Sequence, residues 1–360
     1  MQGRALRVYY YNNLWHYFGN IPFYLENLSS PYTAPQLSAD EVYNNLITEL
    51  ESVINSNVLP MRWDDVNCGR MSQAMCYMMY AEMVMYQKDT SRYATALQYM
   101  QEIINDKNEY GIMDDFASIW KNSGEWCKES IWEVNYEIGF SERSWSNPQG
   151  IGGTVLPTLI SPNSWPGGEG WDAGANGWGF MPVRTETYNM FASNDKRRDA
   201  TVWDCRGVEY TKRYQDTGFW LGKYRPYTEN NATSGDKDLN YNNNLRVYRV
   251  AEAYLNAAEL LLETGGDATK AKDYVNVIRR RAGIAELGAV TVDDVINERH
   301  LEFVGEGKRY FDLVRTGKAA TVLVPDSYGY RTNSWTESKK YIPIAQAELD
   351  SDPALVQNNY

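Results

Sequence analysis

Three tryptophans in a glycine-rich segment are the residues best suited to bind a ligand. Trp165, Trp171 and Trp178 lie within fourteen positions. Amide and carboxylate side chains are interleaved with them, namely Asn163, Glu169, Asp172 and Asn176. A sugar ring has an apolar face on which an indole can stack and a polar rim that amides and carboxylates can bind. The alternative is a loop packed on the scaffold with its tryptophans inward, and for any single tryptophan the sequence favours neither arrangement.

The composition of residues 141–180 sets this segment apart from the rest of the chain. It contains nine glycines, four prolines and four tryptophans, the fourth being Trp145, and it has no helical period. Such a segment cannot enclose four indoles by itself, so the scaffold or a ligand must cover them. A second aromatic group could line the same surface or belong to the core: Phe219, Trp220, Tyr224 and Tyr227. The candidate ligand-binding residues are therefore Trp165, Trp171, Trp178, Trp220 and Tyr227.

A run of charged residues at 298–315 is compatible with acid–base catalysis, because paired carboxylates can exchange protons with a substrate. Opposite charges three or four positions apart on a helix also form ordinary ion pairs. Arg299 is placed to reach Glu302, and Arg309 to reach Asp312. The structural interpretation is strongly favoured here. It also applies to Arg249 and Glu252, and to the arginines at 279–281 before Gly283, where we expect a helix to end.

Motifs for nucleotide, zinc or hydrolase chemistry are absent from the sequence. It contains no GxSxG, P-loop, GxGxxG or HExxH. His16 follows Trp15 within an expected helix and has no nucleophile or acid near it in sequence. The four cysteines form no CxxC pair, and with two histidines no zinc-ligand spacing appears. The run Asp236-Lys-Asp238-Leu-Asn240 offers oxygens for Ca²⁺ but lacks the glycine and distal glutamate of a calcium loop, so a solvated turn is favoured. We expect no catalytic residue, metal or cofactor.

Composition and charge narrow the class of partner. Hydrophobic residues make up 43% of 360 residues, enough for a substantial core. The net charge of −12 disfavours nucleic acid and anionic membrane surfaces as partners. Tyrosine and tryptophan, at 28 and 12, far outnumber phenylalanine at 9. These rings suit surfaces that are partly wet, because each carries a polar group beside an apolar face.

The pattern of apolar residues predicts a mainly α chain. Helices are expected at 3–18, 40–55, 70–87, 91–105, 246–264, 268–282, 292–304 and roughly 309–318. Between them lies a mixed region, 107–245, in which Ile131 to Val134 alternates like a short strand. The sequence has no apolar run of about 18 residues that would span a membrane. It also shows no signal peptide and opens within an expected helix, so we expect residues to precede it in the full protein.

Two of the predicted helical hairpins resemble each other. Tyr77, Ala81, Glu82 and Met83 match Tyr254, Ala258, Glu259 and Leu260. In the following helices, Ala96, Tyr99, Met100 and Ile103 match Ala271, Tyr274, Val275 and Ile278, and the turns differ by two residues. Small residues where the helices cross, with an aromatic one turn away, are typical of tetratricopeptide repeats. The alternative is that any two amphipathic hairpins look alike.

Several segments resemble the SusD/RagB family. The first runs from Val247 to Glu259 and contains an Arg-x-Ala-Glu helix leading into an Ala-Glu hairpin. The most specific is 298–315, with Glu298-Arg299, Glu302-Phe303, Gly305-Glu306-Gly307 and Arg309-Tyr-Phe-Asp312-Leu313. Residues 275–283, the ending from Ile342-Pro343 to Gln357-Asn358, and the front from Ala5 to Pro22 also agree, with Asn20 where the family usually has Asp. The middle, 107–245, matches least.

The resemblance implies one SusD-like domain of tetratricopeptide-like hairpins packed against a loop-rich half. Its parts would be hairpins at 1–106, a ligand-binding region at 107–245, hairpins at 246–320 and a tail at 321–360. It also implies a cell-surface lipoprotein of the outer membrane that serves polysaccharide utilisation. Such a protein binds a glycan, delivers it to a SusC-like TonB-dependent transporter, and is not an enzyme. Contact with the membrane would be made only through a lipid anchor in the full-length protein.

Two other functions stay open on the sequence. A helical-repeat scaffold could bind a protein or peptide, or a nutrient other than a sugar. A glycoside hydrolase is the third hypothesis. The identity of the glycan cannot be derived from the sequence, because stacking on an aromatic ring tolerates many sugars.

Overall fold

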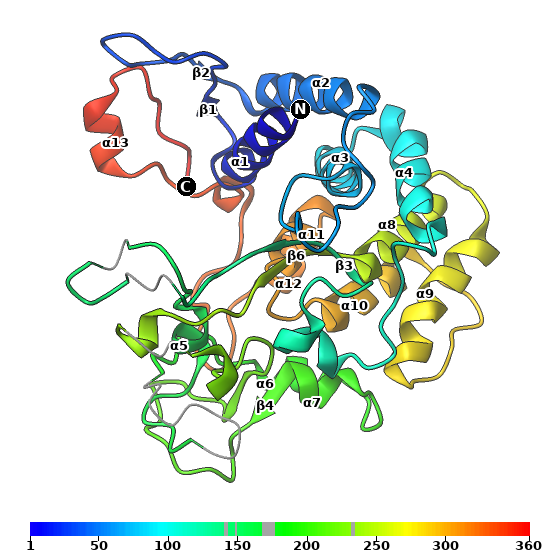
Figure 1. Cartoon of the computed structure of the whole chain (residues 1–360), viewed down its shortest axis with the longest axis vertical. Coiled ribbons are helices and arrows are strands. Elements are labelled where there is room, and N and C mark those ends of the chain that lie inside the picture. Colours follow the sequence, from blue (N-terminus) through cyan, green and yellow to red (C-terminus); the bar gives the residue numbers. More distant parts are fainter. Residues whose placement is uncertain (140–142, 148–149, 168–176, 232–234) are drawn as a thin grey trace. The chain divides into compact units, whose positions relative to one another are not determined.

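A computed structural model describes residues 1–139, 143–147, 150–167, 177–231 and 235–360. Helices predominate and the strands are short, which confirms the predicted mainly α fold (Figure 1). The chain forms two compact units, and each gathers segments that are distant in sequence. One unit comprises Met1–Asp64, Arg70–Tyr99 and Tyr310–Tyr360. The other comprises Asp65–Gly69 and Met100–Arg309, and it holds the candidate ligand-binding residues.

The first unit is built from the amino-terminal helices and the carboxy-terminal tail. Its helices are α1 (Gln2–Phe18), α2 (Ala39–Asn55), α3 (Gln73–Gln87), the first half of α4 (Tyr93–Asn105), nearly all of α11 (Arg309–Arg315), α12 (Ala319–Val322) and α13 (Gln346–Ser351). The two short strands β1 (Ile21–Pro22) and β2 (Gln36–Leu37) pair antiparallel. Short 3-10 turns lie at Thr90–Arg92 and Glu337–Lys339.

The second unit combines a helical part with an irregular part. The long helices are α8 (Val250–Glu263), α9 (Ala268–Ala282) and α10 (Val292–Glu302), and the short ones are α5 (Leu156–Ile160), α6 (Thr185–Met190) and α7 (Arg197–Thr201). Two antiparallel pairs complete it, β3 (Ser130–Val134) with β6 (Leu245–Arg249), and β4 (Val202–Asp204) with β5 (Phe219–Leu221). Short 3-10 turns lie at Ala117–Trp120, Asn122–Gly124, Thr228–Asn230 and Lys237–Leu239.

The residues matched between the two hairpins meet in the structure. Tyr77 of α3 stacks on Tyr99 of α4, with ring centroids 4.1 Å apart and planes 4° apart. Tyr254 of α8 meets Tyr274 of α9 edge to face, at 5.5 Å and 79°. Small residues at the matched positions, such as Ala81 and Ala258, are fully buried where the helices approach. Each hairpin therefore brings a tyrosine from each of its two helices into contact, stacked in one hairpin and edge to face in the other.

The boundaries of two elements show how local signals operate. Helix α9 ends at Gly283, which has a left-handed φ of 75°, as the sequence predicted. Helix α8 begins at Val250, so the prediction of helix from 246 was wrong. Residues Leu245–Arg249 instead form β6 and pair with β3, whose strand the sequence did predict. The sequence Leu-Arg-Val-Tyr-Arg alternates apolar and polar residues as a strand does. Pairing with β3 then stabilises the strand conformation over the helix.

Other residues considered for chemistry have structural roles. His16 is buried among the rings of Trp15, Tyr86 and Phe311, and its Nδ1 lies 2.8 Å from the Asn12 carbonyl. None of the four cysteines is joined in a disulfide bond. Within the described ranges, no helix combines the length and the apolar character needed to cross a lipid bilayer.

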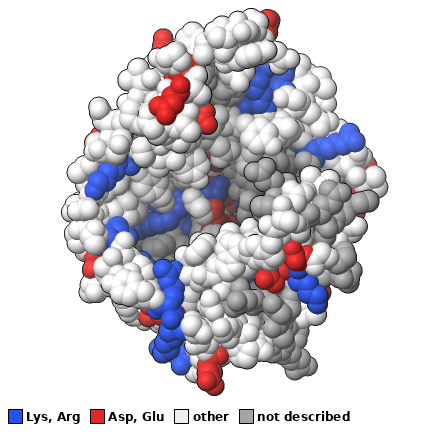
Figure 2. Space-filling model, turned by 90° about the vertical axis from the view of Figure 1, so that its left-hand side faces the viewer, with Lys and Arg blue, Asp and Glu red and all other residues white. Residues whose placement is uncertain are grey.

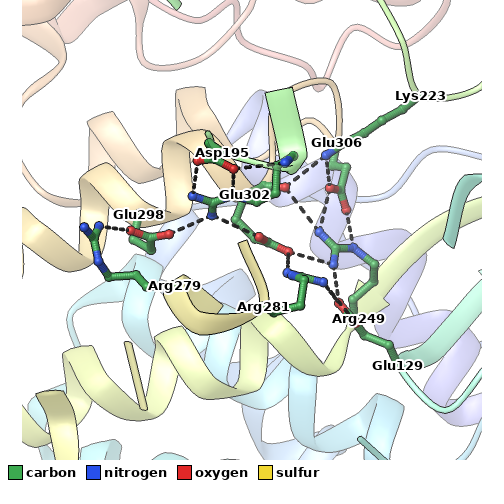
Figure 3. A network of polar contacts seen from close by, with 10 residues as sticks. Glu129, Asp195, Lys223, Arg249, Arg279, Arg281, Glu298, Glu302 and Glu306 are labelled. Carbon is green, nitrogen blue, oxygen red and sulfur yellow. Dashed lines mark hydrogen bonds and ion pairs between the residues drawn. The ribbon is translucent and has the colours of Figure 1, made fainter. Parts of the chain in front are cut away.

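A network of buried charges forms the centre of the second unit (Figure 3). The carboxylate of Glu302, at the end of α10, is fully buried and lies 2.6 Å from Arg281, 3.0 Å from Arg249 and 3.2 Å from Arg197. These arginines come from α9, the end of β6 and the start of α7. Further acids complete their pairing: Glu129 and Glu306 bind Arg249, while Asp195 and Glu298 bind Arg197. The network thus ties the long helices to the irregular part.

The charges in this network are held by one another. Burial alone would raise the pKa of Glu302, but Arg281, Arg249 and Arg197 lower it well below its usual 4.5. The same balance, through Arg249 and Lys223, lowers the pKa of Glu306. Burial lowers the pKa of Lys223 to about 8, although its ammonium lies 2.6 Å from Glu306. Both glutamates are therefore ionised and enclosed in the folded protein.

The structural interpretation of these charges was right, and the contacts of Arg299 and Glu302 reach beyond their own helix. Arg299 lies 2.6 Å from Asn256 and 3.2 Å from Glu252, both on α8, and Glu302 binds arginines of three other elements. Sequence spacing predicts neighbours on one helix and cannot show which helix packs against it.

We expect Glu302→Gln to lower the free energy of unfolding by roughly 3–5 kcal/mol, because it leaves buried arginines without a counter-charge. Urea denaturation measures this change. The control is Glu286→Gln, which removes an ion pair with Arg280 at 2.9 Å whose side chains are 49% and 53% exposed. The control should cost about 0–1 kcal/mol. Equal effects of the two substitutions would contradict the central role of Glu302.

Acid should also unfold the protein through this network. The pKa values of Glu302 and Glu306 lie below 4.5 when folded, so the unfolded chain takes up protons first as the pH falls. Their contribution is complete above the unfolded value of 4.5 and is lost as the pH falls through the folded values. Urea titrations from neutral pH to about pH 3 should show stability decreasing, and less steeply in Glu302→Gln. A pH-independent midpoint would exclude this account.

Candidate functional site

Three aromatic rings form an exposed cluster in the second unit. Trp145 and Phe180 are 57% and 62% exposed, and Trp178 lies partly buried between them. The ring centroid of Trp178 is 5.5 Å from that of Trp145, with planes 34° apart, and 5.9 Å from that of Phe180, with planes 64° apart. We call Trp145, Trp178 and Phe180 the aromatic platform. Its rings offer apolar surface to solvent in more than one plane.

Main-chain hydrogen bonds hold one side of the platform. The N–H groups of Trp178 and Phe180 donate to the carbonyls of Thr158 and Leu159 in α5, each at 2.9 Å. Gly179 between them donates to the Ser161 carbonyl, also at 2.9 Å. The last carbonyls of a helix lack partners within it, so residues 178–183, which we call the platform segment, satisfy groups that α5 leaves open. The position of these rings is therefore set by the backbone.

Trp220 of β5 packs against the platform segment at Gly179. It is fully buried, and a Cβ added to Gly179 would lie 3.2 Å from the indole ring. Gly179 also has a left-handed φ of +66°, which favours glycine. The adjoining residues continue the contact, because Pro182 bridges to Trp220 and Val183 donates to the Phe219 carbonyl at 2.7 Å. The platform segment thus contacts both α5 and β5.

The segment 236–240 braces the other side of the platform. The carboxylate of Asp236 accepts the N–H of Trp145 at 2.7 Å, and Asn240 donates to the Arg143 carbonyl at 2.7 Å. The Asp238 carbonyl accepts the hydroxyl of Thr158 at 2.6 Å, which connects the segment to α5. In the described part of the chain, no group of three or more His, Cys, Asp or Glu side chains lies together as metal ligands would. The contacts of 236–240 are those of a bracing turn.

The structure separates the five candidate residues. Trp178 lies in the platform. Trp165 is partly buried and packs edge to face on Trp203, with centroids 4.5 Å apart. Tyr227 is half-buried beside the turn Thr228–Asn230, and Trp171 lies outside the described residues. Except for Trp220, their contact with a ligand stays a prediction.

Trp220 requires a correction. Its side chain is 0% exposed and belongs to a core cluster with Trp203 and Cys205, so its indole is not available to stack on a ligand. Tyr224 of the same sequence group is also in the core, 1% exposed. The strand β5 is buried on both faces, and a short apolar run does not reveal this in sequence.

Two platform residues were not among the five. Trp145 was noted only for composition, and Phe180 was not considered. The available signal was the glycine between two aromatic residues in Trp178-Gly179-Phe180, which indicates close backbone approach. The partnership of Trp145 with Trp178 has no local signal, since the two are brought together by the fold.

Comparison with known proteins identifies the family. The sequence model described as the SusD family matches residues 128–360. The chain belongs to the SusD family. Among curated SusD relatives, it is 25% identical to SusD-like protein P25 of Formosa agariphila over 400 residues, covering 99% of this chain and 70% of that protein.

Solved structures resemble this SusD-family chain over its whole length. It is 61% identical to surface glycan-binding protein A from Bacteroides uniformis, with a TM-score of 0.91, covering 100% of this chain and 77% of the other. It is 52% identical to surface glycan-binding protein A from Bacteroides thetaiotaomicron in complex with laminarihexaose, with a TM-score of 0.93 and coverage of 100% and 78%.

Trp220 and Trp178 should respond differently to truncation. We expect Trp220→Ala to lower the free energy of unfolding by roughly 3–5 kcal/mol, because it leaves a cavity under Gly179. Trp178→Ala removes ring contacts at the surface and should cost about 1 kcal/mol. Urea denaturation of both variants tests this. If Trp178→Ala were as destabilising as Trp220→Ala, the platform would be part of the core.

Proposed function

We propose that this SusD-family protein binds a neutral glucan of the laminarin type on the cell surface, with the aromatic platform as a principal contact. The observation that carries the proposal is the 52% identity, over the whole chain, to a surface glycan-binding protein whose structure holds laminarihexaose. The platform supplies the matching chemistry, because exposed indole and phenyl rings can cover the apolar faces of pyranose rings.

The arrangement of the rings favours a glucan that turns. Planes 34° and 64° apart cannot all lie flat against a straight ribbon of β-1,4-linked glucose. A β-1,3-linked chain changes direction along its length and can present successive sugar faces to tilted rings. We therefore infer a preference for β-1,3 linkage.

The charge of the protein favours a neutral ligand. The net charge of −12 repels polyanions such as sulfated or uronic polysaccharides. On the face drawn in Figure 2, basic and acidic side chains are interspersed among a majority of uncharged ones. Stacking and hydrogen bonding, rather than ion pairing, would then supply the affinity.

We further propose that the protein binds without catalysis. Glycoside hydrolysis needs two carboxyl groups facing the sugar bond. The clustered carboxylates Glu302 and Glu306 are at most 3% exposed and paired with arginine and lysine, so they have no access to a polysaccharide. Pairing with buried arginines and lysine accounts for the presence of these carboxylates, so no role in hydrolysis is needed to explain them.

Delivery to a SusC-like TonB-dependent transporter is the remaining part of the proposal. It rests on membership of the SusD family, as does location at the outer-membrane surface through a lipid anchor. Co-purification of the full-length protein with a TonB-dependent transporter, after mild detergent extraction of outer membranes, tests both. Recovery in the soluble fraction without a transporter would refute them.

We expect laminarihexaose to bind the purified protein more tightly than cellohexaose, as measured by isothermal titration calorimetry. Trp145→Ala and Trp178→Ala should each weaken laminarihexaose binding about five- to tenfold, since each removes a stacking surface worth about 1–1.4 kcal/mol. The half-buried Trp335 of the other unit gives the matched control, and Trp335→Ala should leave the affinity per folded molecule unchanged.

The same samples test the absence of catalysis. After incubation for hours, mass spectrometry should find laminarihexaose intact. Release of shorter oligosaccharides, abolished by one carboxylate substitution, would contradict the proposal. Unchanged affinity in both platform variants would place the glycan site elsewhere on the protein.

A further inference from the structure

The loop formed by residues 211–216 lies against the platform segment, residues 178–183. Arg213 donates from Nη1 to the Gly179 carbonyl, between Trp178 and Phe180. Its Cδ lies 3.7 Å from the position that a Cβ of Gly179 would take. At the start of the loop, the N–H of Thr211 donates to the Asn163 carbonyl at 2.9 Å. The loop is therefore a neighbour of the platform, although the two are more than thirty residues apart in sequence.

The conformation of this loop is fixed from within. Asp216 accepts the N–H of Arg213 at 3.2 Å, and also the hydroxyl of Tyr210 and the N–H of Gly218, both at 2.7 Å. Arg213 donates from Nε to the Tyr214 carbonyl at 3.2 Å. Gln215 has a left-handed φ of 59°, which costs free energy for a residue with a side chain. Contacts on both sides thus hold an exposed turn in one strained conformation.

Tyr214 lies in this turn and is 83% exposed. Its carbonyl accepts from the same guanidinium that donates to the Gly179 carbonyl, so the side chain of Arg213 connects its backbone to the platform segment. A ring that is mostly exposed to solvent on a fixed loop contributes little to the stability of the fold. For a ligand it offers stacking surface with little ordering cost, because the loop is already fixed.

We propose that Tyr214 is an additional stacking position for the glycan on the platform, one that only longer oligosaccharides reach. The proposal rests on the proposed function, since it extends the same surface. The platform then contacts one part of the chain, and Tyr214 contacts sugar rings further along it. Arg213 and Asp216 are positioning residues that keep the two surfaces at a fixed separation. This assigns the protein a preference for glucan chains over short fragments.

Affinity as a function of chain length tests this inference. Laminarihexaose and the shortest laminari-oligosaccharide with saturable binding are titrated into the unaltered protein, Tyr214→Ala and Trp178→Ala. Tyr214→Ala should weaken laminarihexaose binding by about three- to tenfold, as for loss of one aromatic contact, and leave the short oligosaccharide unchanged. Trp178→Ala should weaken both. Tyr32→Ala, which removes a tyrosine 72% exposed in the other unit, is the control and should change neither.

The outcomes separate this inference from the function on which it rests. If Tyr214→Ala leaves laminarihexaose binding unchanged, or weakens both oligosaccharides equally, the additional position is refuted while the platform stands. If the unaltered protein binds no laminari-oligosaccharide, the proposed function fails and the inference fails with it.

Discussion

The second unit depends on one constraint, that the charge of Glu302 must be neutralised out of contact with water. Arginines from α7, α9 and the end of β6 do this at 2.6–3.2 Å. A buried carboxylate without them would be far less stable, so α10 can pack only when all three elements are in place. Replacing such buried charges by well-packed apolar residues is often neutral or stabilising, whereas removing one partner alone is strongly destabilising.

The platform is connected to this centre through β5. Lys223 binds Glu306 at 2.6 Å and lies two residues after the end of β5, the strand that contains Trp220. Trp220 packs against Gly179, and Gly179 lies between Trp178 and Phe180 in the platform segment. Trp220, which the sequence suggested as a ligand contact, therefore lies in the core beneath the platform segment. There it helps to position Trp178 and Phe180, whose rings do reach solvent.

The sequence predicted what local patterns and the family resemblance determine. Helices such as α9, with its end at Gly283, follow from periodicity and capping, and the mainly α fold follows from them. It did not predict features that depend on distant segments. The strand β6 exists because β3 is beside it, Arg299 pairs across to α8, and Trp145 meets Trp178 through the fold. Trp220 and Trp178 look alike in sequence, yet one is fully buried and the other only partly buried, because burial is decided by what packs around a residue.

The hydrogen bonds from 178–180 to the Thr158, Leu159 and Ser161 carbonyls have a consequence for how such a protein can change over time. They use only main-chain atoms, so they persist whatever side chains occupy positions 178 and 180. Ring size and polarity at these two positions can be exchanged without loss of the fold, whereas Gly179 cannot accept a side chain above Trp220. Relatives could therefore acquire new sugar preferences through two substitutions on a fixed backbone. The same two positions are where an engineer would begin to redirect this scaffold toward another polysaccharide.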